Sequence, residues 1–141
     1  MLERLHEHIN LELQTNTRTD TIYVVTAILF NFVMLGINAA MAGEATNPDL
    51  QRDATPMAVL AITLLLSILV NGIAVAGLFT GRQTRQKLLG GLLKMYEDAN
   101  VGQYYDRTLL TNYNRRYTMF TAVIGLLGIM AIVIPIVVLL T

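Results

Sequence analysis

Three long stretches without any charged side chain dominate this sequence. They cover residues 21–43, 55–81 and 117–141. Each exceeds the roughly 20 apolar residues that a helix needs to cross a bilayer core about 30 Å thick. Only 14% of the 141 residues are charged and 54% are hydrophobic, whereas an ordinary soluble domain has about a quarter charged residues. The sequence therefore predicts an all-α integral membrane protein with three transmembrane helices in one domain.

The positions of Lys and Arg predict how the chain is oriented. Nine of these ten residues fall in residues 1–20 and 82–116, which lie on the same side of a three-span chain, and the tenth is Arg52 in the loop 44–54. By the positive-inside rule, we expect the N-terminus in the cytoplasm and the C-terminus outside, in the cytoplasmic membrane of a prokaryote. Twenty residues, most of them polar, precede the first run, unlike the short basic start of a cleaved signal peptide, so we expect this run to be retained.

Residues 1–20 carry the pattern of a short amphipathic helix. Glu3 and Glu7 lie opposite an apolar face, and the polar connector QTNTRTD follows, with Asp20 or Thr21 as a candidate cap for the first span. Helices that lie on a membrane surface usually have a basic polar face. This acidic face favours docking against protein over lying on lipid, and both interpretations stay open. The apolar positions are Leu2, Leu5, Ile9 and Leu13.

Residues 82–116 are the only sizeable polar part and carry a net charge of +4, from seven basic and three acidic residues. Leucines at helical spacing continue the second span, Gly90 and Gly91 weaken that helix, and a second helix leads into the third span. We expect a cytoplasmic helical hairpin that serves as an interaction surface. Its candidate residues are Arg82, Arg85, Lys87, Lys94, Tyr105, Tyr113, Arg115 and Arg116.

The loop 44–54 is too short for an external domain, and it forces the first two spans into an antiparallel pair. Thr55 as a cap and Pro56 in the first helical turn mark the start of the second span.

The sequence lacks the groups that most chemistry needs. No Asp, Glu, His, Lys or Arg lies inside the three uncharged runs, so acid–base catalysis and proton relays within the membrane are not expected. There is no cysteine for a disulfide or a thiolate metal site. One Glu3-x-x-His6 spacing matches half of a di-iron motif, but no second copy accompanies it. We predict that the protein is not an enzyme and binds no metal or cofactor.

A stripe of uncharged polar side chains runs along the first two spans. With a helical rise of 1.5 Å per residue, Asn31 lies near the depth of Ser67 and Asn71, and Asn38 lies near the depth of Thr63. Interhelical hydrogen bonds at these two levels would contribute about 0.6–2 kcal/mol each. The stripe has three interpretations: closure of a three-helix bundle, an interface between chains, or the lining of a pore.

Small residues mark faces on which another backbone can approach closely. The second span carries Gly72 and Ala76 at the small-xxx-small spacing, and the third carries Thr121, Gly125 and Gly128 near one line. These faces predict helix packing within the chain or an interface with another one.

The leading functional hypothesis is association: an accessory or scaffold subunit of a membrane assembly, or a homo-oligomer. The expected partners are membrane lipid, further copies of the chain, or a larger complex contacted through the hairpin and the third span. The alternative is a homo-oligomeric channel lined by the polar stripe and gated by the cytoplasmic part. Nucleic acid is not an expected partner, because Lys and Arg are already needed at residues 82–116 to set the topology.

Overall fold

The computed structural model describes residues 2–48, 54–105 and 108–141, so residues 49–53 of the predicted external loop and 106–107 of the predicted hairpin lie outside it. The described chain forms three long α-helices, α1 (Leu2–Ala45), α2 (Thr55–Asp98) and α3 (Thr108–Leu140), with a short 3-10 helix η2 (Gly102–Tyr104) between α2 and α3. Thr55 is the first residue of α2 and Pro56 lies in its first turn, but the predicted cap role of Thr55 is wrong, because Ala54 occupies the cap position.

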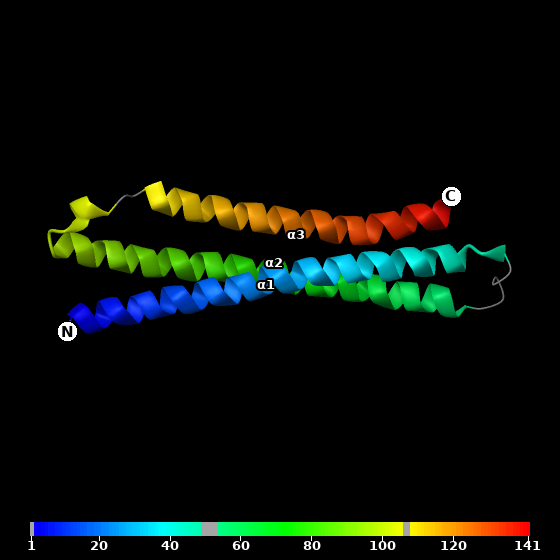
Figure 1. The fold of residues 1–141 in the computed structure, drawn as a ribbon, viewed down its shortest axis with the longest axis horizontal. Helices are drawn as coiled ribbons and strands as arrows, with labels where there is room; N and C mark the ends of the chain where they lie inside the picture. Colours follow the sequence, from blue (N-terminus) through cyan, green and yellow to red (C-terminus); the bar gives the residue numbers. More distant parts are fainter. Residues whose placement is uncertain (1, 49–53, 106–107) are drawn as a thin grey trace.

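The three helices lie side by side in an elongated bundle (Figure 1). The N-terminus lies at the same end of the bundle as the turn between α2 and α3, and the C-terminus lies at the opposite end. We call the first of these the basic end, since it holds residues 2–20, 82–98 and 108–116, where nearly all Lys and Arg residues of the chain lie.

All three helices are long and apolar enough to cross a membrane. Along their middle parts, large apolar side chains point outward: Leu29, Ile62, Leu65 and Leu126 are each more than 60% exposed. Such a surface is unfavourable in water and matches a hydrocarbon surrounding. These are the features of an integral membrane protein with three spans.

The predicted separate N-terminal helix is wrong, because α1 runs without a break from Leu2 to Ala45. The stretch predicted as a polar connector is helical. Its hydroxyls bond within the helix itself: Thr17, Thr19 and Thr21 each donate to the carbonyl four residues earlier. Asp20 and Thr21 therefore cap no helix start. Of the two earlier interpretations of this segment, contact with protein is seen, as the His6 ring lies 5.7 Å from that of Tyr96 in α2.

The predicted separate hairpin is also not seen: residues 82–98 are the continuation of α2, and residues 108–116 are the first turns of α3. The α2 helix passes through Gly90 and Gly91 and ends after Asp98. Asn100 adopts a left-handed conformation (φ 58°) there. Its N–H bonds to the Glu97 carbonyl and that of Val101 to the Tyr96 carbonyl, the pattern of a Schellman cap.

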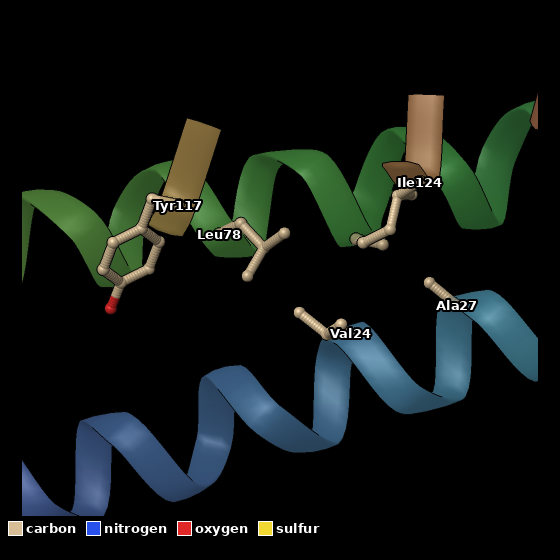
Figure 2. Close-up of a cluster of buried hydrophobic side chains, with 6 residues drawn as sticks. Val24, Ala27, Leu78, Tyr117 and Ile124 are labelled. Carbon is tan, nitrogen blue, oxygen red and sulfur yellow. The ribbon is translucent and has the colours of Figure 1, made fainter. Parts of the chain in front are cut away.

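The apolar core lies where α1 contacts both other helices. Figure 2 shows Val24 and Ala27 on α1 facing Leu78 on α2 and Tyr117 and Ile124 on α3, and Ala74 belongs to the same cluster. Close approach depends on small residues here. A Cβ on Gly77 would lie 3.2 Å from the ring of Tyr23. This core holds the polar groups on either side of it in register.

Candidate functional site

Two asparagine side chains pair in the middle of the bundle. The Asn31 amide on α1 donates to Asn71 Oδ1 on α2 at 2.8 Å, and Asn71 donates back to Asn31 Oδ1 at 2.8 Å. Asn71 gives its second N–H to the Ser67 carbonyl at 2.8 Å, and Asn31 is 1% exposed. We call these two residues the amide pair. Its two side chains bond to each other within one chain, as one of the predicted pairings requires.

Asn38 does not pair with Thr63 as predicted. Its Nδ2 donates to the Ala131 carbonyl of α3 at 3.0 Å, and its Oδ1 is buried without a hydrogen-bond partner among the described residues. The Thr63 hydroxyl bonds instead to the carbonyls of Val59 and Leu60 in its own helix. The prediction failed because a backbone carbonyl on a third helix competes with a side chain at the same depth.

Ser67 is fully buried, and its hydroxyl donates to the Thr63 carbonyl at 2.8 Å. It therefore makes no interhelical side-chain bond, although its own carbonyl accepts from Asn71. Of the predicted stripe, Asn31 and Asn71 join α1 to α2, Asn38 joins α1 to α3, and the two hydroxyls stay within α2.

The predicted small residues divide into two groups. A Cβ on Gly128 would lie 2.9 Å from Asn71 Cγ, so this glycine makes room for the amide pair inside the chain. A Cβ on Gly72 or Gly125 would meet nothing within 4 Å. Ala76 is exposed and Thr121 is half-buried. Only Gly128 of this set is required for close packing within the chain.

A second polar site lies at the basic end and includes residues that the sequence analysis did not assign to a site. Asp20 is 8% exposed, and its Oδ2 accepts hydrogen bonds from the Tyr117 hydroxyl and from Asn16 Nδ2. Asn16 Nδ2 also lies 3.1 Å from the Gly81 carbonyl and 3.3 Å from the Tyr117 hydroxyl. These contacts link all three helices. In Figure 2 the Tyr117 side chain lies among the core residues, and its hydroxyl is directed toward α1.

Arg85 completes this site from α2. Its Nη1 donates to Thr17 Oγ1 at 2.6 Å, and its guanidinium carbon lies 4.1 Å from the centre of the Tyr113 ring. Arg85 lines one small cavity of about 40 Å³ together with Asp20 and Tyr117. Its Nε is buried without a hydrogen-bond partner among the described residues. We call Asn16, Asp20, Arg85 and Tyr117 the Asp20 cluster.

Gly81 makes the Asp20 cluster sterically possible. A Cβ at this position would overlap Asp20 Oδ1 and lie 3.0 Å from Asp20 Cγ. The carboxylate therefore rests against bare α2 backbone. Gly77 and Gly81 have the small-xxx-small spacing, but this spacing does not indicate which side chain occupies the space.

The predicted interaction surface separates into inward and outward residues. Arg82 donates through Nε to Asn114 Oδ1 at 3.2 Å, and Gln86 donates to the same oxygen at 2.9 Å, so Arg82, Arg85 and Tyr113 take part in contacts between helices. Tyr105 lies against Tyr96, with ring centres 6.1 Å apart. The exposed members of the predicted surface are Lys87, Lys94, Arg115 and Arg116.

In both sites, hydrogen bonds between polar side chains join helices to one another. In the Asp20 cluster a buried carboxylate is held by two donors, and in the amide pair the two side chains hold each other. Among the residues that the structure describes, no group of three or more His, Cys, Asp or Glu side chains could hold a metal ion. Comparison with protein-family models, curated proteins and solved structures finds no match to this chain.

Proposed function

We propose that the chain is a non-enzymatic integral membrane protein that acts by association, as an accessory or scaffold subunit or as a homo-oligomer. In this proposal the basic end lies in the cytoplasm, as the positive-inside rule requires. The observation behind it is that the polar groups of the spans bond within one chain, whereas small residues and several cations are exposed on the outer surface.

The polar groups of the spans support the proposal because they bond within one chain. Asn31, Asn38 and Ser67 are each at most 1% exposed, and the two asparagines bond across helices. Lipid offers no partners to polar groups, and inward-facing amides are therefore favoured in a membrane.

The outer surface offers two small-residue faces and the basic end for association. Gly72 and Ala76 are exposed on α2, and Gly125 on α3 has open space where a side chain would lie. The basic end also extends well beyond the apolar runs: residues 82–98 of α2 alone span about 25 Å at 1.5 Å per residue. Its exposed cations, Lys87, Lys94 and Arg115, are free to meet an acidic partner surface.

The alternative function is a homo-oligomeric channel lined by the polar stripe. It would require Asn31, Asn38 and Ser67 to leave their buried positions and face a shared water-filled space. We therefore place it second. Ion conductance by proteoliposomes that contain the wild-type chain, abolished by Asn71→Leu, would favour the channel over association.

The test of association is the size of the protein extracted from its own membrane. We expect the wild type to run on a native gel as an assembly larger than one chain. The variants Ala76→Leu and Gly125→Leu place bulk on the two outer small-residue faces and should shift it toward the monomer. Gly36→Leu is the matched control, as Gly36 on α1 is also exposed with nothing within 4 Å of its Cβ position. A wild-type chain that migrates as a monomer would contradict the proposal.

A further inference from the structure

A groove lies between α2 and α3 at the basic end. It consists of two cavities of about 260 and 300 Å³ that share Arg82 and Tyr117 in their linings. The first is also lined by Gln86, Leu89 and Asn114. We call the two cavities together the α2–α3 groove.

The charged side chains of the α2–α3 groove lie toward one end, although both of its cavities also have apolar linings. The cavity toward the basic end is lined by Arg82 and Arg85 and also by Leu89 and Leu93. Beyond Arg82, the first charged residue after the second run, the groove is lined by uncharged side chains of the runs 55–81 and 117–141. These are Leu78, Phe79, Thr118, Thr121 and Ala122. The charged end therefore lies where a membrane's headgroup layer begins, and the uncharged end lies beside its acyl chains.

The charges of the α2–α3 groove favour an anion. Arg82 and Arg85 both line it, and neither cavity has an Asp or Glu in its lining. Asp20 lines the separate small cavity on the other side of Arg85. The Arg82 contact with Asn114 uses one of the five N–H donors of a guanidinium. Arginine forks match the geometry of a phosphate group.

We propose that the α2–α3 groove binds one anionic phospholipid, with the phosphate at Arg82 and Arg85 and an acyl chain along Leu78, Phe79 and Ala122. Basic pockets between membrane helices are suited to acidic lipid headgroups. This inference uses the membrane location of the proposed function and is independent of association. A bound lipid would fill the space between α2 and α3 and join the two helices at the membrane surface.

The test is lipid retention by the purified full-length chain, measured by native mass spectrometry with phosphatidylglycerol or phosphatidylcholine at equal concentration. We expect one phosphatidylglycerol per chain, bound about tenfold more tightly than phosphatidylcholine. Both lipids carry the phosphate, but phosphatidylcholine also carries a cationic choline group, which the two arginines repel. Equal retention of the two lipids would overturn the proposal.

Variants separate the headgroup site from general surface charge. Arg82→Gln should weaken phosphatidylglycerol binding about tenfold, whereas Lys87→Gln and Arg115→Gln, which remove exposed cations outside the groove linings, should leave it unchanged. An equal loss in all three variants would show diffuse attraction and overturn the site.

Ala122→Phe tests the acyl-chain part without touching a charge. It should fill the apolar cavity and weaken retention of phosphatidylglycerol, with the helical content measured by circular dichroism unchanged. Unchanged retention would overturn the acyl-chain placement, and a change in oligomeric mass without loss of lipid would assign the groove to a second copy of the chain.

Millimolar inorganic phosphate should not displace the lipid. Full displacement of the lipid by phosphate would identify a free-anion site instead.

Discussion

The Asp20 cluster and the amide pair both bury polar side chains between helices, but they differ in charge and in the number of helices that they join. The amide pair is neutral and joins α1 to α2 through two hydrogen bonds of 2.8 Å. The Asp20 cluster contains a carboxylate and draws on all three helices. Both rely on a glycine for space, Gly128 at the amide pair and Gly81 at the Asp20 cluster.

This difference indicates that the two sites stabilise the bundle in different ways. The two side chains of the neutral amide pair bond to each other at mid-depth, so the pair adds modest stability and fixes the register of two helices. A buried carboxylate is costly unless every partner is in place. The Asp20 cluster therefore depends on the correct rotation of α1, α2 and α3 together, and it is the region where small changes should have large effects.

The largest expected effect is that of Gly81→Ala. The new methyl group would overlap the Asp20 carboxylate and separate it from Tyr117 and Asn16. Because a buried charge would lose its donors, we expect the free energy of unfolding in mixed micelles to fall by about 4 kcal/mol. Gly125→Ala, whose Cβ meets nothing within 4 Å, is the matched control and should be close to neutral. Similar losses in the two variants would mean that Asp20 is not held against α2.

A smaller effect is expected from Asn31→Leu. This change leaves the Asn71 amide without its partner in the middle of the bundle, and we expect a loss of about 1–2 kcal/mol in the free energy of unfolding. The double variant Asn31→Leu/Asn71→Leu should recover part of the loss, since no amide is then left unpaired.

Asn38→Leu is the control for this pair. Asn38 donates only to a carbonyl of α3 and already has an unpartnered Oδ1, so its replacement should cost less than that of Asn31. If the loss of unfolding free energy in Asn31→Leu/Asn71→Leu equalled the sum of the losses in Asn31→Leu and Asn71→Leu, these two residues would not be partners.

The three spans could be predicted from the sequence, and Asn71 was one of the two residues, with Ser67, predicted to lie at the depth of Asn31. Uncharged runs report spans directly, and a short loop fixes the depths at which residues of neighbouring spans meet. The separate N-terminal helix and the hairpin were wrong for a common reason. A change from apolar to polar composition marks where a helix leaves the membrane, and it does not mark where the helix ends.

The rest of the site could not be predicted because it depends on the third helix. Asn38 meets a backbone carbonyl of Ala131, which carries no signal in the sequence. In the sequence, Asp20 resembles a helix cap. In the fold, its carboxylate accepts a hydrogen bond from Tyr117 of α3, and this contact depends on the rotation of α3. The glycine at residue 81 was visible as a small residue, but its role depends on the carboxylate that fills its place.

In this structure the amide pair closes the bundle within one chain. The sequence contains no cysteine, so Asn31→Cys/Asn71→Cys can be treated in the membrane with a short bifunctional thiol reagent without background. We predict an internal cross-link, seen as a monomer that migrates faster on a denaturing gel, and no dimer when chains that carry Asn31→Cys alone are mixed with chains that carry Asn71→Cys alone. A cross-linked dimer from that mixture would contradict an intrachain pair, because it would place the partner of Asn31 in another chain.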